Sequence, residues 1–310
     1  MRTITRPDIL SAVGKTPLFE LKSFCDSKRD IRIFAKVEFL NASGSVKDRA
    51  AKAMILDGIE CGAFTKEKIL IDSTSGNTGI AYASVCAALG YRARLYMPAN
   101  VTEERRKYMK ALGAQIILTD IMEGIDGAYS AVQREVEAQP DRYFFPDQYT
   151  NKNNWLAHYN GTANEIIEQT DGRITHFVAG TGTSGTFMGC TRRLKETDPR
   201  IKCYNMTPDS PFHGIEGVKH CTCLTRHGFF DESVSDGRIE VTTEEAYAVA
   251  RALAVKEGIF AGISSGANVT AAAKLALEAP EGSVIVTVLC DSGSRYFSGQ
   301  LWRDADAENK

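Results

Sequence analysis

The sequence predicts an α/β protein with two open, mostly parallel twisted sheets flanked by helices. Short β-branched runs alternate with longer amphipathic stretches along most of the 310 residues. This alternation is typical of parallel strands joined by helices that cover both faces of a sheet. The number of runs suits two sheets better than one, and a polar stretch, "FPDQYTNKNN", interrupts the alternation. We therefore expect two domains that divide near residue 150.

The individual elements follow from the same pattern. Strands are expected at 68–73, 92–98, 114–120, 175–180, 202–208 and 283–291, and helices at 79–90, 102–113, 126–138, 154–169, 185–197, 243–257 and 266–278. Gly90 and Gly113 mark two helix ends, because glycine favours the left-handed conformation that terminates a helix. Thr102 is expected to cap the helix that follows it. In such sheets ligands bind beyond the carboxyl ends of the strands, where loops lead into helix N-termini.

Composition argues against several classes of function. A net charge of −2 provides no basic excess for nucleic acid or an anionic membrane surface. No apolar run reaches the roughly 20 residues that span a bilayer, and "MRTITRPDIL" lacks the apolar segment of a secretory signal. The eight cysteines are irregularly spaced, which favours reduced thiols in a cytoplasmic protein over a disulfide framework.

Lys47 is the first candidate for chemistry. It stands in "NASGSVKDRAAK", between a Gly/Ser-rich turn and the first turn of an expected helix. A lysine in open solvent carries a solvated ammonium, whereas a lysine held in a cleft can lose its proton and form a Schiff base with an aldehyde cofactor. The residue taken alone leaves both interpretations open.

Two loops rich in Gly, Ser and Thr are candidate anion sites. "STSGNTG", residues 73–79, offers hydroxyl groups, an amide and backbone N–H groups at a helix N-terminus, which suits a carboxylate. "GTGTSGT", residues 180–186, has the composition of a phosphate cup. It lacks the Lys-Ser/Thr pair of a P-loop and misplaces the third glycine of G-x-G-x-x-G. Each loop taken alone is also consistent with an ordinary turn or helix cap.

A third loop, "GISSGA", residues 262–267, opens the last expected helix. Ser264 or Ser265 is expected to cap that helix, and one hydroxyl is a candidate partner for a heterocyclic nitrogen. A lysine, a phosphate cup, a carboxylate cradle and a serine together match the needs of pyridoxal phosphate. A neutral serine leaves the ring nitrogen unprotonated, and the weaker electron sink suits β-elimination and β-replacement.

The chain resembles the cysteine synthases, which are fold type II (β-family) pyridoxal-phosphate enzymes with a tryptophan synthase β-like fold. The similarity runs almost end to end, through "VGKTPL", "KVEFLNASGSVKDRAA", "TSGNTGIA", "DQYTNKNNWLAHYNGTANEI", "GTGTSGT", "GIFAGISSGA" and "LCDSGSRYFS". "AHYNGTANEI", "QTDGRITHFVAG" and Ser184, where other members have glycine, are most similar to the cysteine synthase B (O-acetylserine sulfhydrylase B) type.

The resemblance implies a role for each candidate residue. Lys47 would be the Schiff-base lysine and the base that removes the substrate α-proton. Asn77 would bond the phenolic oxygen of the cofactor, and Ser264 its ring nitrogen. The cofactor phosphate would be bound by Gly182, Thr183, Ser184, Gly185 and Thr186. The substrate α-carboxylate would be bound by Thr74, Ser75, Asn77, Thr78 and Gln148.

The resemblance also implies an N-terminal domain over 45–151 with a mobile part near 90–130, a C-terminal domain formed by 1–44 with 152–310, and a homodimer. The implied reaction is β-replacement on O-acetylserine or O-phosphoserine by sulfide or thiosulfate, which gives L-cysteine or S-sulfocysteine. Closure of the mobile part over the bound carboxylate would exclude water.

Other reactions on the same fold share these motifs. They are those of a cystathionine β-synthase core, a cyanoalanine synthase and a cysteine lyase that releases sulfide, because only the second nucleophile or the direction of the reaction differs. A non-catalytic peptide-binding homologue is a remoter alternative.

Two further features lie in the segment 207–228. Lys219 stands nearest to the position where B-type enzymes carry arginine, so it is a candidate for binding an anionic co-substrate or leaving group, with a solvated loop lysine as the alternative. Cys221 and Cys223 form a C-x-C near His227, which is a weak metal or redox signal, because zinc sites usually require C-x₂₋₄-C and a second pair. No metal is expected.

Overall fold

The computed structural model describes residues 8–74, 76–222 and 228–303, and the chain divides into two compact units. Unit 1 comprises Met1–Gly14 and Asn41–Asn153, and unit 2 comprises Lys15–Leu40 and Asn154–Lys310. Residues 8–14, which the sequence places in the C-terminal domain, group with unit 1 instead. The reason is local packing: Leu10 is buried in the core of unit 1, and Lys52 Nζ donates a hydrogen bond of 2.8 Å to Leu10 O.

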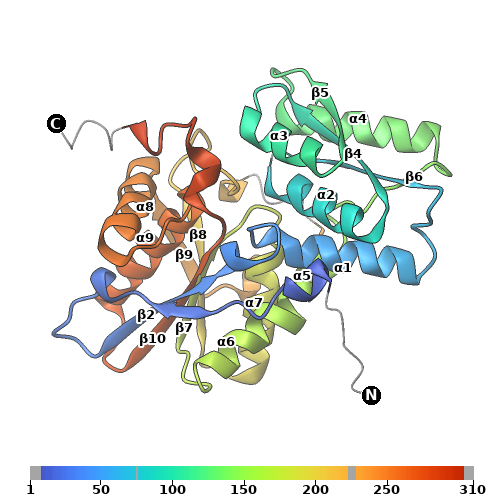
Figure 1. The fold of residues 1–310 in the computed structure, drawn as a ribbon. Helices are drawn as coiled ribbons and strands as arrows, with labels where there is room; N and C mark the ends of the chain where they lie inside the picture. The colour runs from blue at the N-terminus through green and yellow to red at the C-terminus, as the bar shows by residue number, and fades with distance from the viewer. Residues whose placement is uncertain (1–7, 75, 223–227, 304–310) are drawn as a thin grey trace, which may run out of the picture. The chain divides into compact units, whose positions relative to one another are not determined.

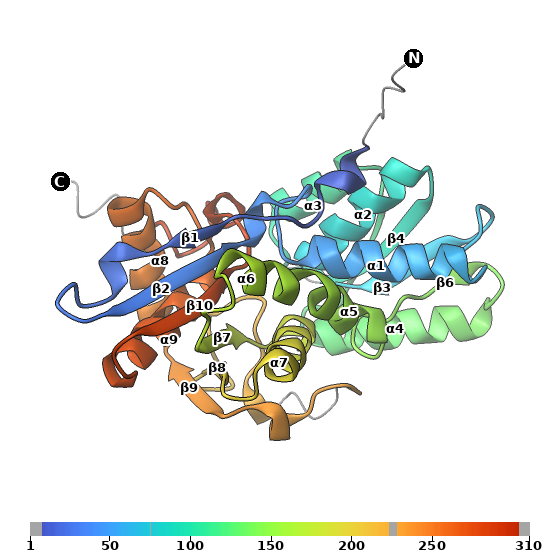
Figure 2. The ribbon, with the colours of Figure 1, turned by 90° about the horizontal axis from the view of Figure 1, so that it is seen from below.

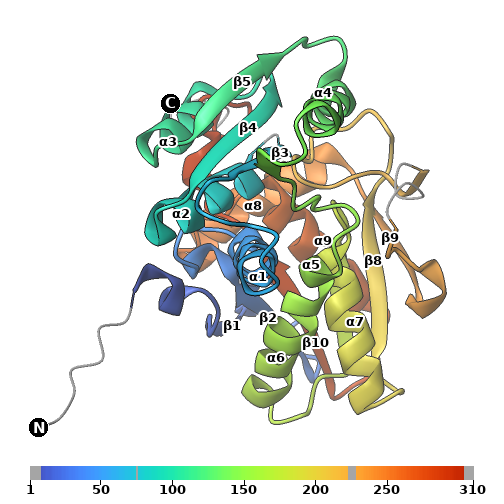
Figure 3. The same cartoon turned by 90° about the vertical axis from the view of Figure 1, so that its right-hand side faces the viewer.

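Unit 1 is built on a four-stranded parallel sheet in the order β5-β4-β3-β6 (Figure 1). Its strands are β3 (Ile69–Ser73), β4 (Arg92–Pro98), β5 (Gln115–Thr119) and β6 (Tyr143–Phe144). Its helices are α1 (Lys47–Glu60), α2 (Asn77–Leu89), α3 (Glu103–Ala111) and α4 (Gly124–Ala138). Figure 3 shows α2 and α3 on one face of this sheet and α4 on the other.

The central strands β3 and β4 of unit 1 bury apolar residues on both faces, as expected for a covered parallel sheet. Leu70 and Leu95 pack into a core that includes residues of α1 and α2. Ile71 and Tyr96, one position further along the same strands, belong to a second core that includes residues of α4. Helices therefore cover both faces of the sheet around β3. The carboxyl end of β3 leads into the N-terminus of α2.

Unit 2 is built on a six-stranded sheet in the order β1-β2-β10-β7-β8-β9 (Figure 2). β1 (Leu18–Glu20) runs antiparallel to β2 (Ile31–Val37), and β10 (Ser283–Leu289), β7 (His176–Gly180), β8 (Lys202–Pro208) and β9 (Gly237–Val241) continue the sheet in parallel. The helices are α5 (Lys152–Ala157), α6 (Ala163–Gln169), α7 (Gly185–Thr197), α8 (Thr243–Glu257) and α9 (Ile263–Glu278). A π-helical turn over His158–Thr162 joins α5 to α6.

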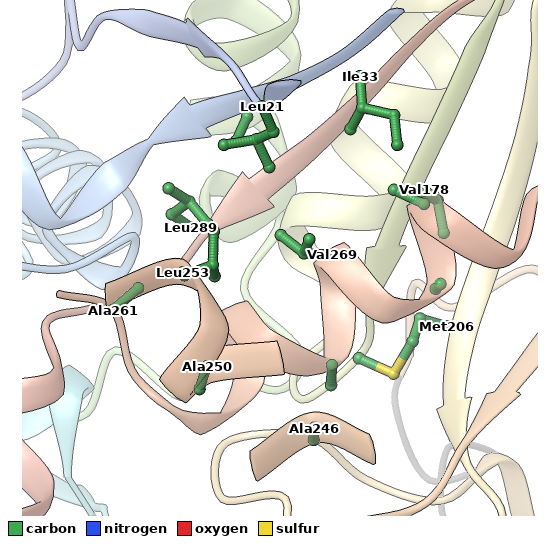
Figure 4. Close-up of a cluster of buried hydrophobic side chains, with 14 of the residues drawn as sticks. Leu21, Ile33, Val178, Met206, Ala246, Ala250, Leu253, Ala261, Val269 and Leu289 are labelled. Carbon is green, nitrogen blue, oxygen red and sulfur yellow. The ribbon is translucent and has the colours of Figure 1, made fainter. Parts of the chain in front are cut away.

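The main core of unit 2 fixes the position of α9. Ile33, Val178 and Leu289 of the sheet cluster with Val269 of α9 (Figure 4). Gly266 lets α8 approach closely, since a Cβ added there would lie 2.1 Å from Ala246 O. The N-terminus of α9, which carries two candidate serines, is therefore held by dense packing on both sides.

The predicted strands and helices are found, with several differences. β1, β2, β6 and β9 form in segments for which no strand is expected, and the π-helical turn interrupts the helix expected at 154–169. α2 begins at Asn77, so this residue lies in the first helical turn. Thr102 occupies the N-cap position of α3, but its hydroxyl is buried with no partner in the described part of the chain.

The prediction that Ser264 or Ser265 caps α9 is wrong. The N-cap is Gly262, and Ser265 Oγ instead accepts a hydrogen bond of 2.9 Å from Cys290 N. Glycine is required at the cap because Asp291 approaches it, so that a Cβ added to Gly262 would lie 2.1 Å from Asp291 Oδ1.

Two expectations from composition concern membrane-spanning segments and the state of the cysteines. Within residues 8–74, 76–222 and 228–303, every helix is too short or too polar to cross a bilayer. The cysteines of these ranges are free thiols.

Candidate active site

Lys47 is the first residue of α1, and it is half-buried. The turn before it is fixed by the buried carboxylate of Asp48, which accepts hydrogen bonds of 2.5 Å from both Ser43 N and Ser43 Oγ. Gly44 supplies a φ of +90°, which other residues rarely adopt. No described residue accepts a hydrogen bond from Lys47 Nζ, so the turn holds the start of the helix without using this amine.

The carboxylate loop, defined here as residues 73–79, lies between β3 and α2. Thr74 Oγ1 accepts hydrogen bonds from Gly76 N (3.2 Å) and Gly79 N (3.1 Å), so it satisfies two N–H groups at the N-terminus of α2, whose N-cap is Gly76. Thr78 Oγ1 donates to Gln148 Oε1 (2.8 Å), and Gln148 Nε2 donates to Ser73 O (3.0 Å). Three members of the predicted carboxylate-binding group therefore lie together at one helix N-terminus. A fourth, Ser75, lies outside the described residues.

Positive charge and close packing shape the same loop. The buried guanidinium of Arg105, from α3, lies beside it, since a Cβ added to Gly76 would be 3.4 Å from Arg105 Nε. A Cβ at Gly79 would lie 2.5 Å from Thr74 Cγ2 and 2.7 Å from Met109 Sδ, so only glycine fits there. The cation and the N-terminus of α2 both favour an anion at this loop.

A buried carboxyl group, Asp72, immediately precedes the loop. Its Oδ1 accepts a hydrogen bond from Ser73 N (2.7 Å), and its Oδ2 accepts one from Tyr82 OH (2.9 Å). Burial raises the pKa of Asp72 to about 7, although the hydrogen bonds from Tyr82 and Ser73 oppose this shift. A carboxylate inside the apolar strand "ILIDS" is the sequence signal that could have pointed to this residue.

This pKa predicts a pH-dependent stability. The pKa of Asp72 is about 7 in the folded protein and about 3.9 in an unfolded chain. Between these pH values the folded protein binds more protons than the unfolded chain, so the folded state loses stability as the pH rises. From about pH 5 to about pH 8, Asp72 is expected to cost about 3 kcal/mol in the free energy of unfolding. Urea unfolding of wild type and Asp72→Asn at both pH values checks this. An equal pH response of the two proteins would contradict it.

The phosphate loop, defined here as Gly182–Thr186, leads into α7. Ser184 adopts a left-handed φ of +69° at the N-cap, and its buried Oγ has no hydrogen-bond partner among the residues the structure describes. A Cβ added to Gly185 would lie 2.0 Å from Asn154 Oδ1. Backbone N–H groups of a helix N-terminus, hydroxyl donors and an unsatisfied buried hydroxyl fit a phosphate group.

Two residues that the sequence pattern did not single out hold the phosphate loop in place. Asn154 Nδ2 donates a hydrogen bond of 2.9 Å to Thr183 Oγ1. His158 Nε2 lies 3.3 Å from Thr186 Oγ1, and its Nδ1 lies 2.9 Å from Thr162 Oγ1. Asn154 and His158 are four residues apart in "NNWLAH", the spacing that places both on one helical face.

Replacing Ser184 by glycine is expected to stabilise the cofactor-free protein by about 1 kcal/mol, because glycine adopts the left-handed conformation without strain and leaves no buried hydroxyl unsatisfied. The same change is expected to weaken cofactor binding several-fold, since one donor is lost. Ser184→Ala is the matched control, because it removes the hydroxyl and keeps the strained backbone. Thermal melts and cofactor titrations of both variants check this. A glycine variant less stable than the alanine variant would count against it.

Ser264 and Lys219 are both placed in unit 2. Ser264 lies in the first turn of α9, buried, and its hydroxyl has no hydrogen-bond partner within the described ranges. Lys219 N donates a hydrogen bond of 2.8 Å to Thr181 O, and a Cβ added to Gly182 would lie 2.3 Å from Gly217 O. The segment that carries Lys219 is therefore held against the start of the phosphate loop.

The described residues contain no group of three or more His, Cys, Asp or Glu side chains arranged to hold a metal ion. Cys223 and His227 of the weak C-x-C signal lie outside these residues.

A family model described as pyridoxal-phosphate-dependent enzyme matches residues 9–291. The chain belongs to this family. A cysteine synthase of Aquifex aeolicus is 50% identical to this pyridoxal-phosphate-dependent enzyme over 97% of the chain and 94% of its own length. Cysteine synthase B of Salmonella typhimurium is 39% identical over 92% of the chain and 93% of its own length.

A solved structure of cysteine synthase from Entamoeba histolytica is 35% identical to this pyridoxal-phosphate-dependent enzyme and superposes with a TM-score of 0.91, covering 98% of this chain and 92% of that one. The predicted fold type II architecture, with two parallel-rich sheets flanked by helices, is confirmed. The phosphate loop of the pyridoxal-phosphate-dependent enzyme suits the phosphate of its cofactor, because a helix N-terminus and the unsatisfied buried hydroxyl of Ser184 lie together there. The half-buried amine of Lys47 suits its aldehyde.

Proposed function

We propose that this enzyme makes L-cysteine or S-sulfocysteine by β-replacement, in which sulfide or thiosulfate displaces the β-substituent of O-acetylserine or O-phosphoserine. The observation that carries the proposal is the 50% identity to a cysteine synthase over 97% of the chain. The hydrogen-bonded carboxylate loop supports it, because an amino-acid substrate presents a carboxylate that must be bound.

The proposal assigns a cofactor contact to each of the candidate residues. Lys47 Nζ would hold the cofactor covalently, Gly182–Thr186 its phosphate, Asn77 its phenolic oxygen and Ser264 its ring nitrogen. When bound to these residues, pyridoxal phosphate would supply the electron withdrawal from Cα of the amino-acid substrate. The neutral Ser264 hydroxyl would moderate this withdrawal, in keeping with loss of a group from the β-carbon.

Side chains of the protein are assigned to substrate binding and proton transfer. Thr74, Ser75, Thr78 and Gln148 bind the α-carboxylate, which fixes the orientation of Cα. Lys47 Nζ, once exchanged for the substrate amine, takes the proton from Cα and holds it. Acetate or phosphate leaves the β-carbon with its bonding electron pair. The sulfur nucleophile then forms a bond to the same carbon, and Lys47 Nζ returns the proton to Cα. Closure of residues near 90–130 over the bound carboxylate would keep water from the reacting centre.

Lys219 is assigned to an anionic co-substrate or leaving group. Its backbone bond to Thr181 O supports this role, since it ties the residue to the start of the phosphate loop. The test is Lys219→Ala assayed with thiosulfate and O-phosphoserine, and with sulfide and O-acetylserine as the less charged pair. A selective rise in KM for the anionic pair supports the assignment, and unchanged kinetics with both pairs reject it.

The proposal extends to a homodimer in the cytoplasm, supported by the family resemblance and by the free thiols of the described residues. Light scattering of the purified holoenzyme tests the dimer, and a monomer at assay concentration would reject it.

The reaction is tested by a matrix of substrates. The holoenzyme is incubated with O-acetylserine, O-phosphoserine, serine or cysteine, each combined with sulfide, thiosulfate, homocysteine or cyanide, and the products are identified by mass spectrometry. Cysteine or S-sulfocysteine as the fastest-formed product supports the proposal. Cystathionine, cyanoalanine or released sulfide as the fastest-formed product would assign one of the related reactions instead, and the absence of any product would favour the non-catalytic alternative.

A further inference from the structure

A chain of hydrogen bonds connects the interior of unit 1 to the carboxylate loop. Tyr82 OH and Ser73 N both donate to the fully buried carboxylate of Asp72. Ser73 O accepts from Gln148 Nε2, and Gln148 Oε1 accepts from Thr78 Oγ1. These bonds link the Asp72 carboxylate, through Ser73, to Gln148 and Thr78.

The geometry points to Asp72 and Tyr82 as positioning residues that fix Gln148 and Thr78 for binding the substrate α-carboxylate. The inference rests on the proposed function, which gives the loop an amino-acid substrate. Neither residue needs to touch the substrate, since both act through Ser73 and Gln148.

The orientation of the Gln148 amide explains why such an anchor matters. Its Nε2 donates to Ser73 O and its Oε1 accepts from Thr78 Oγ1, so these two bonds fix which way the amide faces. A flipped amide would place its carbonyl oxygen against Ser73 O, and two acceptors cannot form a hydrogen bond. Holding Ser73 through Asp72 keeps its carbonyl where only the N–H side of the amide can pair with it.

Tyr82 stabilises the buried carboxylate of Asp72. Its hydroxyl donates to the Oδ2 atom of Asp72, from the helix that starts at the carboxylate loop. A buried carboxylate without enough donors is costly, so this bond stabilises Asp72 in the position that holds Ser73 and Gln148.

The test compares wild type with Asp72→Asn and Tyr82→Phe as holoenzymes. Asparagine replaces one accepting oxygen by an N–H₂ group, so one of the two donors, Ser73 N or Tyr82 OH, loses its acceptor. Dissociation constants for L-alanine and L-alaninamide are measured from the change in cofactor absorbance, and KM and kcat are measured with O-acetylserine. Cys86→Ala is the matched control, because Cys86 is buried on the same helix without contacting Asp72 through a hydrogen bond.

We expect the dissociation constant for L-alanine to rise about 10-fold in Asp72→Asn and about 3-fold in Tyr82→Phe, because the first change removes a charged acceptor and the second a single neutral donor. Binding of L-alaninamide, which lacks the carboxylate, is expected to stay unchanged, and KM is expected to rise more than kcat falls. Cys86→Ala is expected to melt at lower temperature and to bind both ligands as wild type does.

Two results would overturn the inference. One is wild-type affinity for L-alanine in both variants, and the other is an equal loss of affinity for L-alanine and L-alaninamide, which indicates general damage. If Asp72→Asn does not fold, Tyr82→Phe decides alone. Binding of L-alanine involves only its amine and its carboxylate and no reaction at the β-carbon. The comparison therefore tests the role of Asp72 even if the product assays reject the proposed β-replacement.

Discussion

Lys47→Ala is expected to lower the rate of product formation from O-acetylserine or O-phosphoserine by roughly 10³-fold or more, because it removes both the covalent holder of the cofactor and the proposed base. Borohydride reduction and peptide mapping of wild type are expected to find the pyridoxyl label on Lys47. The variant is expected to fold, since Asp48 and Ser43 hold the start of α1 without the Lys47 side chain.

Two further variants separate the possible causes. Lys47→Arg keeps the positive charge but cannot form the covalent bond, so it is expected to be as inactive as the alanine variant. Lys52→Ala removes another lysine of α1, whose Nζ donates to Leu10 O (2.8 Å), so it is expected to lose stability and keep its activity. A label found on a different lysine, or a Lys47→Ala enzyme with near wild-type rates, would refute the assignment.

The fold was predictable wherever local pattern decided it. β3, β4 and β5, with the helices between them, alternate at short range, and each strand contains three or more consecutive apolar residues. β2 was not expected, although Ile31, Ile33 and Ala35 alternate with other residues, because its position depends on pairing with β10, whose sequence lies about 250 residues away. β9 is a half-exposed edge strand, and its polar alternation gives a weak signal.

The site was predictable where glycine and hydroxyl residues cluster in one loop. Its supporting residues were not, because Asp72, Asn154 and His158 act through partners distant in sequence. The N-cap of α9 could not be predicted for the same reason. The two serines favour a cap at 264 or 265, whereas the approach of Asp291, which is distant in sequence, requires glycine at the actual cap, Gly262. Short-range rules identify the groups that can touch a ligand, and long-range packing decides which neighbours hold them.

Gly182→Ala is expected to weaken cofactor binding by about 100-fold. A Cβ at this position would lie 2.3 Å from Gly217 O, a backbone atom that no side-chain rotation can move away. Either the phosphate loop or the segment that carries Lys219 must shift, and the loss of two or more bonds to a phosphate amounts to about 3 kcal/mol. Titration of the cofactor-free protein with pyridoxal phosphate measures the change.

The control must distinguish loop displacement from general strain. Gly172→Ala serves this purpose, because Gly172 has a φ of +69°, nothing lies within 4 Å of an added Cβ, and the residue is in a turn of the same unit. It is expected to lower the melting temperature, through about 1–2 kcal/mol of backbone strain, without changing cofactor affinity. Equal affinities in the Gly182 and Gly172 variants would show that the close approach of Gly182 to Gly217 does not shape the phosphate loop. A selective loss in Gly182→Ala would instead link cofactor binding to the position of Lys219, because the same backbone segment supports both.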